Sequence, residues 1–437
     1  MFGIAQELKE LEEQGKYLKM AIIGCGQMGR GMTSQVIQMN GMKPVVVVDI
    51  MIENAKNALL HAGIQEDDIC EAKTPEEADK YIEEGKYVIS SDAAIAINCK
   101  GVECVVDSTG VTEIGAKIAV DSIKAHKHII MLNVECDVVI GPLLYKMAKE
   151  EGVIYTGSAG DEPGAVMELY DFATALGMDV LVIGKGKNNK VDLSMNPDKA
   201  LEEATGKNMS PKMLTAFKDG TKTMVEMTAM ANATGFAPAF THGSGFNATV
   251  KELDQVYRLK EEGGILDRYQ VVDYINGVAP GVYAIVTSKL PEVRAEMRYL
   301  QVGKGEIFTL FRPYHLTSLE TPMSVARILL HNTPSIVPAA GAPYAETTTI
   351  AKKDMKAGEH LDGIGGYTVY GGFHDFKEAQ AKNAIPLGLI NKNTVLKTDV
   401  QAGQLITYDM VELDESSYLL QLRREQDKLL AEGKLTW

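Results

Sequence analysis

The sequence predicts an α/β protein with a doubly wound parallel sheet at its N-terminus, an α+β domain in the middle and a small β-rich domain at its C-terminus. Short apolar runs alternate with amphipathic helical patterns over residues 1–155, which implies parallel strands joined by right-handed crossovers. Longer strands and Gly- and Asn-rich turns fill residues 156–340, and a repeated turn motif marks residues 341–437. These three regions are the expected domains.

The first domain contains six apolar runs of strand length and one helix with a clear start. The helix begins after Thr74, because Thr74-Pro75-Glu76-Glu77 combines an N-cap hydroxyl, a proline at the first helical position and an acid that completes a capping box. The expected strands are residues 19–23, 44–49, 86–90, 103–107, 127–132 and 153–155.

A glycine-rich turn follows the first of these strands and leads directly into a helical pattern. Its sequence is Gly24-Cys25-Gly26-Gln27-Met28-Gly29, and the next strand ends in Asp49, twenty positions after Gly29. This order is typical of the Rossmann dinucleotide-binding fold, in which the pyrophosphate rests on the helix N-terminus and the acid binds the adenosine ribose. A glycine-rich turn without a ligand is the alternative.

The residues around Asp49 favour NAD over NADP as the cofactor. Asp49 would repel a 2′-phosphate, and Ile50-Met51-Ile52 offers no arginine to receive one. Arg30 is the one nearby cation that argues for NADP. We therefore predict NAD(H) as the preferred cofactor and NADP(H) as the alternative.

Two further strand ends carry candidate binding residues, because ligands of open α/β sheets lie beyond the carboxyl ends of the strands. Ser108, Thr109 and Gly110 are small enough to let a nicotinamide ribose approach the backbone, or they form a polar turn. After the next strand, Asn133 could bind the nicotinamide carboxamide or substrate, and Glu135 could act as a general acid or base. Asn133 could instead cap the following helix.

The middle domain is expected to contain four longer strands and a helix at residues 322–331. Before its first helix, Asp161 and Glu162 could bind a metal or a polyol, or complement the helix dipole. The dipole role is preferred for Glu162, whereas both roles remain open for Asp161, which we take as a candidate catalytic residue. The expected strands are residues 178–184, 270–275, 281–287 and 306–311.

A lysine-rich turn is expected directly after strand 178–184, with the sequence Gly184-Lys185-Gly186-Lys187-Asn188-Asn189-Lys190. In an acidic protein this is the best candidate for an anion site, and a lysine can supply the proton that accompanies hydride transfer. We expect Lys185 and Lys187 to be catalytic and Asn188 to bind substrate, and we place Lys190 in a solvated turn.

A second cationic group follows strand 306–311. Arg312 could clamp a phosphate or carboxylate in bidentate fashion, and His315 could join it. A structural role for His315 is the alternative.

Composition limits the partners. The chain has 437 residues and a net charge of −15, which argues against nucleic-acid binding, and no apolar run is long enough to span a membrane. Its five cysteines lie in the first third without disulfide or zinc spacing. We expect a cytoplasmic protein with a small anionic substrate and without nucleic-acid or membrane partners.

The C-terminal region contains a short internal repeat. Residues 354–359 and 399–404 both read Asp-x-x-Ala-Gly-polar, and the Ala-Gly step favours a tight turn before a strand. This predicts a small β-rich module with two related halves. Residues 415–433 form a leucine-bearing amphipathic pattern, from which we expect a helix and a homo-oligomer.

Taken together, these motifs resemble the homoserine-dehydrogenase-like oxidoreductases that carry a C-terminal SAF domain. The resemblance covers almost the whole chain and is nearest to the 1-deoxy-D-xylulose 5-phosphate reductoisomerase-like enzymes. It is carried by the glycine loop and by segments 106–110, 132–135, 160–163, 184–189, 222–226 and 312–320.

The resemblance implies cofactor contacts at the three glycines and near Thr109, and a divalent metal such as Mg²⁺ or Mn²⁺ held by carboxylates. The chain departs from homoserine dehydrogenases at Val134, where those enzymes have a lysine. The implied substrate pocket consists of Asn133, Glu135, Asp161, Lys185, Lys187, Glu226 and Arg312.

The leading hypothesis is an NAD(P)-dependent dehydrogenase, reductase or reductoisomerase that acts on a small phosphorylated or carboxylated ketose or polyol. Two alternatives remain: oxidation of a hydroxy amino acid of the homoserine type, and a non-catalytic protein that senses a dinucleotide or binds carbohydrate. A sensor would need the glycines and Asp49, but not the lysine cluster or Arg312.

Overall fold

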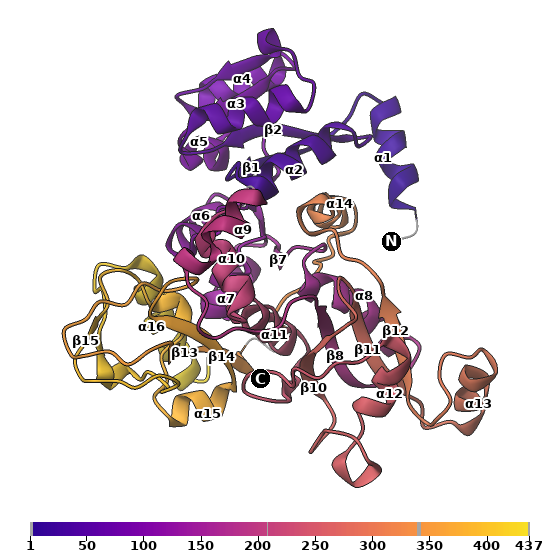
Figure 1. Ribbon diagram of the computed structural model, residues 1–437. Helices are drawn as coiled ribbons and strands as arrows, with labels where there is room; N and C mark the ends of the chain where they lie inside the picture. Colours follow the sequence, from indigo (N-terminus) through magenta and orange to yellow (C-terminus); the bar gives the residue numbers. More distant parts are fainter. Residues whose placement is uncertain (1–2, 208, 339–341, 436–437) are drawn as a thin grey trace. The chain divides into compact units, whose positions relative to one another are not determined.

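The computed structural model describes residues 3–207, 209–338 and 342–435, and it forms two compact units (Figure 1). Unit 1 comprises residues 1–161, 316–337 and 425–429, and unit 2 comprises residues 162–315, 338–424 and 430–437. The chain first passes from unit 1 to unit 2 between Asp161 and Glu162, close to the boundary predicted at residue 156. The further division at residue 341 stays a prediction.

Unit 1 is built on a seven-stranded, fully parallel sheet. Its strand order is the doubly wound order of dinucleotide-binding folds with one additional edge strand, so the predicted fold class is confirmed. From edge to edge the strands are β3 (Ile69–Glu71), β4 (Tyr87–Ser90), β2 (Met42–Val48), β1 (Leu18–Ile23), β5 (Cys104–Asp107), β6 (His128–Met131) and β7 (Tyr155–Gly157).

Two details of this sheet differ from the sequence prediction. Strand β7 lies two residues later than expected, and β3 was not predicted. β3 has only three residues and is half-exposed at the sheet edge, so it lacks the apolar run that marks its neighbours.

Helices connect the strands of unit 1. α4 begins as predicted: the Thr74 hydroxyl accepts from the Glu77 N–H, and the Glu77 carboxylate accepts from the N–H of Lys73. The helices are α1 (Ile4–Glu13), α2 (Gln27–Ile37), α3 (Ile52–His61), α4 (Pro75–Glu83), α5 (Ala93–Asn98), α6 (Thr112–Lys124), α7 (Val134–Glu150) and α14 (Thr321–His331), with short 3₁₀ turns η1 (Glu66–Asp68) and η4 (Thr317–Leu319).

Helix α14 belongs to the core of unit 1, although its sequence lies within the predicted middle domain. Its Val325, Ala326 and Ile328 are buried against Met20 and Ile22 of β1. This packing fixes the segment that follows residue 315 to the strand that leads into the glycine loop.

Unit 2 contains a five-stranded mixed sheet with β8 at its centre. β8 pairs in parallel with β10 and antiparallel with β11, and all four predicted strands of this region are present. In order the strands are β12 (Phe308–Arg312), β11 (Val282–Thr287), β8 (Asp179–Lys187), β10 (Val271–Asn276) and β9 (Ala237–Pro238).

Both faces of this sheet are covered. Apolar side chains of α8 (Glu162–Ala175) and α11 (Thr221–Thr234) pack with Ile183 on one face. Side chains such as Leu253, Tyr257 and Leu266 cover the other. Two long helices on one face of a mixed sheet agree with the α+β class predicted for this region.

The remaining helices of unit 2 are shorter, apart from α16 (Tyr418–Ala431), which has residues in both units and confirms the predicted C-terminal helix. No helix among the described residues is both long and apolar enough to cross a membrane. The others are α9 (Pro197–Gly206), α10 (Pro211–Lys218), α12 (Leu253–Val256), α13 (Pro291–Tyr299), α15 (Phe376–Ala381), η2 (Val250–Glu252), η3 (Lys260–Glu262), η5 (Leu387–Leu389) and η6 (Tyr408–Met410).

The two copies of the C-terminal repeat pair with each other. Met355 and Val400 exchange two backbone hydrogen bonds of 2.9 Å, and these residues occupy the same position in the two copies. The Asp354 carboxylate accepts from the Ala402 N–H, and the Asp399 carboxylate accepts from the N–H of Ala357. The repeat therefore forms a local, approximately two-fold arrangement, in which the two halves suggested by the sequence pair with each other.

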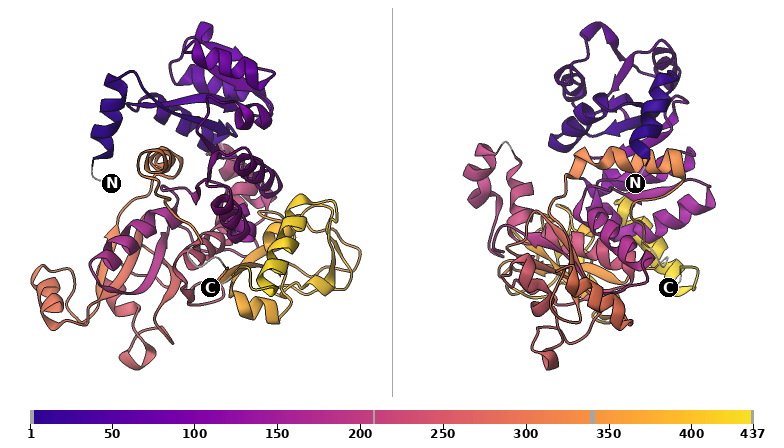
Figure 2. Two further views of the ribbon diagram at one scale, coloured as in Figure 1. Left: turned by 180° about the vertical axis from the view of Figure 1, so that it is seen from behind. Right: turned by 90° about the vertical axis from the view of Figure 1, so that its right-hand side faces the viewer.

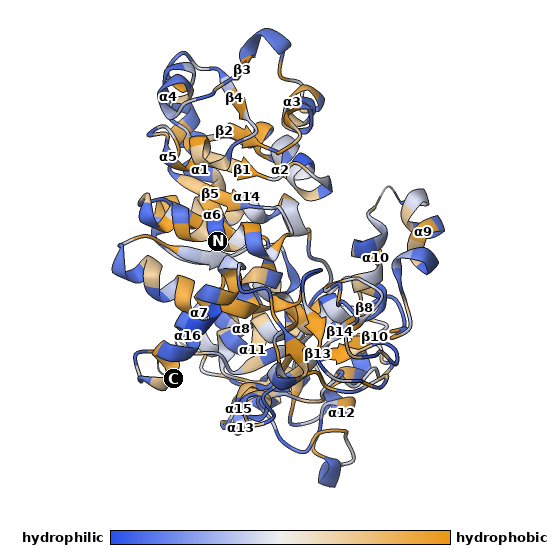
Figure 3. Cartoon of the chain, turned by 90° about the vertical axis from the view of Figure 1, so that its left-hand side faces the viewer, coloured by the Kyte–Doolittle hydropathy of each residue, from blue (hydrophilic) through white to orange (hydrophobic). Residues whose placement is uncertain are grey.

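Short antiparallel strands surround the repeat, and the left view of Figure 2 shows the yellow C-terminal part of the chain as one group. The strands are β13 (Ala345–Ala351), β14 (Val369–Asp375), β15 (Val395–Leu396) and β16 (Val411–Glu412). Many strands of the two larger sheets are hydrophobic, while the helices carry both hydrophilic and hydrophobic stretches (Figure 3). This pattern is expected for two units that each bury a sheet.

Candidate active site

The glycine loop of unit 1 has the geometry of a dinucleotide-binding turn. Gly24 has a left-handed φ of 99°, and a Cβ on Gly29 would lie 1.8 Å from the Gly24 carbonyl oxygen, so neither position accepts a side chain. Gly26 differs, because it is exposed and nothing lies within 4 Å of its Cβ position. It precedes α2 without a side-chain cap, so the first N–H groups of α2, including those of Gln27 and Met28, face an open position.

Asp49 is held at the end of β2, next to this loop. Its carboxylate accepts hydrogen bonds from the N–H groups of Cys25 and Met51 at 2.7 and 2.9 Å, and from the Asn54 amide at 3.1 Å. A carboxylate has about four acceptor positions, so these bonds orient Asp49 without exhausting it. Arg30 on α2 is exposed.

Four exposed large apolar side chains of unit 1 follow the carboxyl ends of two of its strands. Ile50 and Met51, directly after β2, are 87% and 64% exposed, and Val111 and Ile114 follow β5. β1 lies between β2 and β5, and the strand order reverses there. Exposed apolar side chains on both sides of the glycine loop suit the flat faces of a bound dinucleotide.

The small residues after β5 stabilise the loop. The Ser108 hydroxyl donates to the backbone carbonyls at Ile23 and Gly24, and the Thr109 hydroxyl donates to Asp107. Gly110 has a left-handed φ of 66° and open space around it. The proposed cofactor contacts of these three residues would therefore come mainly from their backbone.

Asn133 caps helix α7, which was the alternative to a binding role. Its amide donates to Asp107 and to the Val111 carbonyl, and its Oδ1 accepts from the Cys136 N–H. The side chain is buried and both amide hydrogens are used, so it has no further N–H for a substrate. Glu135 is half-buried in the first turn of α7, and its catalytic role stays a prediction.

The lysine-rich segment is a strand and not the turn that the sequence predicted. β8 continues to Lys187, with Lys185 opposite Tyr274 and Lys187 opposite Asn276. Because side chains alternate along a strand, Lys185 and Lys187 share the face covered by α8 and α11. Gly184 and Gly186 face the other side, where a Cβ would lie 2.4 Å from the Tyr283 hydroxyl and 2.3 Å from the Ala279 nitrogen.

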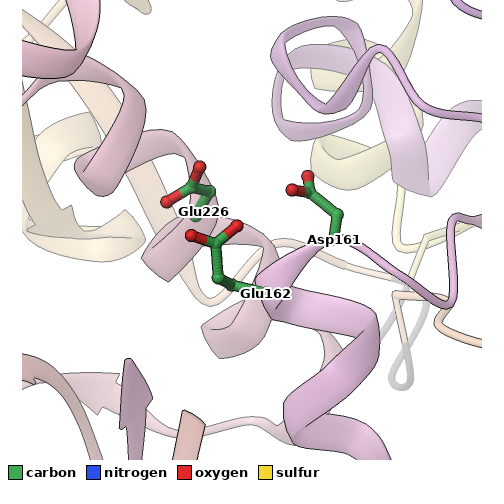
Figure 4. Close-up of side chains that lie close together, drawn as sticks. All are labelled: Asp161, Glu162 and Glu226. Atoms are coloured by element: carbon green, nitrogen blue, oxygen red, sulfur yellow. The ribbon is translucent and has the colours of Figure 1, made fainter. Parts of the chain in front are cut away.

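Lys185 lies between two carboxylates. Its Nζ donates to Glu162 Oε1 at 2.5 Å and to Glu226 Oε2, and the side chains of Lys185, Glu162 and Glu226 are 7%, 11% and 1% exposed. Glu162 is the first residue of α8, and Glu226 lies on α11. Figure 4 shows the carboxylates of Glu162 and Glu226 side by side. Asp161, the residue before Glu162, lies near them. One oxygen from each of the three acids lies within 4.8 Å of the others.

The charges of this cluster depend on one another. Burial lowers the pKa of Lys185, but the neighbouring Glu162 and Glu226 outweigh it and raise the pKa above its ordinary value. Burial and the charge of Glu162 raise the pKa of Glu226, while Lys185 and Lys222 oppose this. The two acids therefore favour the ammonium form of Lys185.

Lys187 has a different environment. Its Nζ donates to the Phe217 carbonyl at 2.8 Å, at the end of α10. Burial and the nearby charge of Lys185 lower the pKa of Lys187 to about 8. A lysine with a pKa near neutrality can exchange a proton during turnover.

The second cationic group adjoins the cluster in unit 2. His315 Nε2 lies 3.3 Å from Glu162 Oε1, and Arg312 lies 3.2 Å from Glu168 and over the Tyr314 ring. Arg312 thus has an acidic partner, which weakens it as an anion clamp. Asn188 and Lys190 are exposed beyond the end of β8, as expected for Lys190.

Sequence reasoning missed part of this arrangement. Glu162 was assigned to the helix dipole, and neither Glu168 nor Lys222 was chosen, although Lys222 lies one helical turn before Glu226 on α11. The spacing Lys222–Glu226 was a usable signal, because residues four apart share a helix face. No local signal shows that Glu162 reaches Lys185, which lies in a different element.

A family model described as "Oxidoreductase DRL, catalytic domain" matches residues 160–321. This segment is shorter than half of the chain, but it contains the whole lysine–carboxylate cluster together with Arg312 and His315. The match supports an enzyme of the oxidoreductase class. No curated protein sequence matches the chain.

Solved structures of dehydrogenases are similar to the chain at low identity. A probable dehydrogenase from Thermotoga maritima is 13% identical, with a TM-score of 0.43 over 74% of this chain and 92% of its own. A scyllo-inositol dehydrogenase from Lactobacillus casei, with bound NAD(H) and scyllo-inositol, is 11% identical, with a TM-score of 0.42 over 75% and 93%. A myo-inositol dehydrogenase from Corynebacterium glutamicum is 10% identical, with a TM-score of 0.41 over 73% and 90%.

Proposed function

We propose that this protein is an NAD(H)-linked oxidoreductase that interconverts a carbonyl and a hydroxyl group on a small phosphorylated or carboxylated ketose or polyol. The observation that carries the proposal is the buried pair Lys185 and Lys187 beside Glu162 and Glu226, within a segment that matches an oxidoreductase catalytic domain. Buried lysines are rare, because burying an ammonium group costs free energy. A protein retains one where the charge is paired or where the lysine is needed for chemistry.

The residues of unit 1 fit a dinucleotide. Gly26 and the N-terminus of α2 would hold the pyrophosphate, Asp49 would bind the ribose hydroxyls, and Ile50 with Met51 would face the adenine. The nicotinamide ring supplies or accepts the hydride when it is bound. NAD is favoured over NADP because the carboxylate of Asp49 would lie where a 2′-phosphate must fit.

The two lysines have separate tasks in this proposal. Lys185 has three N–H groups, two of which are taken by Glu162 and Glu226, so the third can polarise a substrate oxygen. Lys187, whose pKa is lowered to about 8, gives the proton to that oxygen during reduction and takes it back during oxidation. Glu226 orients a neighbouring substrate hydroxyl.

The resemblance to reductoisomerase-like enzymes supports a ketose phosphate as the substrate, whereas Val134 argues against homoserine. Cations near the site, Lys187 and Lys222 among them, suit an anionic group on the substrate. A reductoisomerase differs from a simple reductase because it moves a carbon–carbon bond before the hydride transfer, so product analysis separates the two.

The test is a screen for NADH and NADPH oxidation over ketose phosphates, sugar acids and aspartate semialdehyde. We expect turnover with a phosphorylated or carboxylated ketose and a preference for NADH. Lys185→Met should abolish this turnover and leave NADH binding, followed by fluorescence, unchanged. Turnover of the semialdehyde alone would favour the homoserine-type alternative, and absence of dinucleotide binding would refute the proposal.

A further inference from the structure

We infer that the ammonium group of Lys185 serves as the built-in cation of this site, in the position between Glu162 and Glu226 that a divalent metal would otherwise take. From residue types alone, the closely spaced carboxylates of Glu162 and Glu226 predict a site for Mg²⁺ or Mn²⁺. The arrangement of the side chains does not fit a metal site. The chemical role assigned to Lys185 rests on the proposed function, but cation binding can be measured without turnover.

The geometry places Lys185 between the acids. Its Nζ lies 2.5 Å from Glu162 Oε1 and is hydrogen-bonded to Glu226 Oε2, so the two carboxylates already share one cation. The Lys185 side chain reaches this point from the centre of a five-stranded sheet, where pairing on both sides fixes its backbone. The lysine therefore cannot leave by a loop movement and needs a rotamer change within a packed layer.

The charges lead to the same conclusion. Lys187 follows two residues later on the same face, and Lys222 lies one helical turn from Glu226. A divalent ion added beside Lys185 would be repelled by these positive groups, while two of its three candidate ligands, Glu162 and Glu226, already balance the charge of Lys185. Mg²⁺ also requires near-octahedral oxygen ligands and keeps several waters, whereas these side chains are at most 11% exposed.

The consequence is a site that polarises a substrate oxygen with an N–H donor in place of a metal. A lysine ammonium supplies one positive charge and directed hydrogen bonds, and it needs no metal from solution. His315 Nε2 lies 3.3 Å from Glu162 Oε1, the oxygen that also accepts from Lys185, and Arg312 pairs with Glu168.

The experiment measures Mn²⁺ binding to the full chain by electron paramagnetic resonance and calorimetry, without substrate or cofactor. We expect weak binding to the unmodified protein. Lys185→Met should bind Mn²⁺ at least about tenfold more tightly, because the substitution leaves two buried carboxylates without their cation. The double variant Lys185→Met/Glu226→Gln should lose this gain, which would assign it to the pair.

Two controls separate specific from general effects. Lys187→Met removes a charge on the same strand face but not from between the acids, so its Mn²⁺ affinity should stay within about twofold of the unmodified protein. Lys185→Arg keeps a cation in place and should also show no gain. Thermal unfolding checks each variant, and Lys185→Gln replaces Lys185→Met if the latter does not fold.

Stoichiometric Mn²⁺ binding by the unmodified protein at micromolar concentration, with no gain in Lys185→Met, would overturn the inference. If the substrate screen yields turnover, the rate should be the same with EDTA as with added Mg²⁺, and a metal-dependent rate would also count against it. Absence of turnover with every substrate would refute the proposed function alone.

Discussion

A buried carboxylate in unit 2, Asp273 on β10, should make the stability of the protein fall as pH rises. Its oxygens accept from the Ser244 N–H at 2.8 Å and from the Tyr257 hydroxyl at 3.0 Å, while the Tyr283 hydroxyl donates to the Asp273 carbonyl at 3.1 Å. Burial raises the pKa of Asp273 from 3.8 to about 6, although the hydrogen bonds from Ser244 and Tyr257 oppose it. The folded state therefore holds its proton more tightly than the unfolded chain.

Counting hydrogens shows what a proton on Asp273 adds to this network. The Tyr257 and Tyr283 oxygens also lie 2.5 Å apart, so two hydroxyl hydrogens must serve three contacts when Asp273 is ionised. A protonated Asp273 supplies the third hydrogen and completes a ring of donors. Asp273→Asn should reproduce this ring at every pH, because its amide nitrogen can donate to the Tyr257 oxygen.

The magnitude follows from linkage. A raised folded-state pKa gives stability that is fully present below pH 3.8 and lost as pH rises through about 6, and a shift of two pKa units corresponds to about 3 kcal/mol. Because part of the unfolded-chain Asp273 is already ionised at pH 4, Asp273→Asn should gain about 2.5 kcal/mol in free energy of unfolding, relative to the unmodified protein, between pH 4 and pH 8. Other titrating groups are common to both proteins and cancel in the difference.

The assay is equilibrium urea unfolding of both proteins at intervals from pH 4 to pH 8. Asp267→Asn is the matched control, because Asp267 is exposed and pairs only with Lys260 among the contacts described, so its difference should stay flat. A difference for Asp273→Asn that does not change with pH would refute the reasoning, since it would mean that Asp273 ionises equally easily in the folded and unfolded chains.

Three further predictions concern the cofactor and the lysines. Gly29→Ala should lower the melting temperature and abolish NADH binding, because its Cβ would lie 1.8 Å from the Gly24 carbonyl oxygen. Gly26→Ala should keep the melting temperature and only weaken NADH binding in a fluorescence titration. Equal melting temperatures of the two variants would contradict this reasoning. Carbonyl reduction should slow above pH 8 as Lys187 loses its proton, and a kcat–pH profile without that decline would remove Lys187 as the donor. Asp49→Ser with Ile50→Arg should shift the ratio of NADH to NADPH dissociation constants toward NADPH, and an unchanged ratio would show that these residues do not set the preference.

The fold of unit 1 could be predicted because its signals are local. Each strand of the sheet apart from β3 either is an apolar run or, like β7, overlaps the end of one, and the Thr74 cap marks its helix within four residues. Asn133 shows the limit of such reasoning. An asparagine at a strand end can bind or cap, and only the positions of Asp107 and Val111, which lie more than twenty residues away in the chain, decide for capping.

The candidate site was predicted only in part, because the reason for glycine at positions 184 and 186 lies in other segments of the chain. Gly184-Lys185-Gly186-Lys187 reads as a turn, since glycine is the commonest turn residue. In the structure the glycines are needed because Tyr283 and the 278–279 backbone approach the opposite face of β8 too closely for a Cβ. The partners come from a strand a hundred residues later, so the pattern of alternating glycine and lysine becomes interpretable only once the sheet is known.

The alternation of glycine and lysine along β8 separates a face that stabilises unit 2 from a face that does not. On the glycine face, close packing against Tyr283 contributes to the core. On the other face, burying Lys185 costs free energy that two carboxylates offset, whereas Lys187 is buried with a neutral carbonyl as its hydrogen-bond partner. A methionine of similar length would satisfy the packing at position 187 at lower cost. Stability therefore does not explain the lysine at position 187, whereas the proton transfer proposed for Lys187 does.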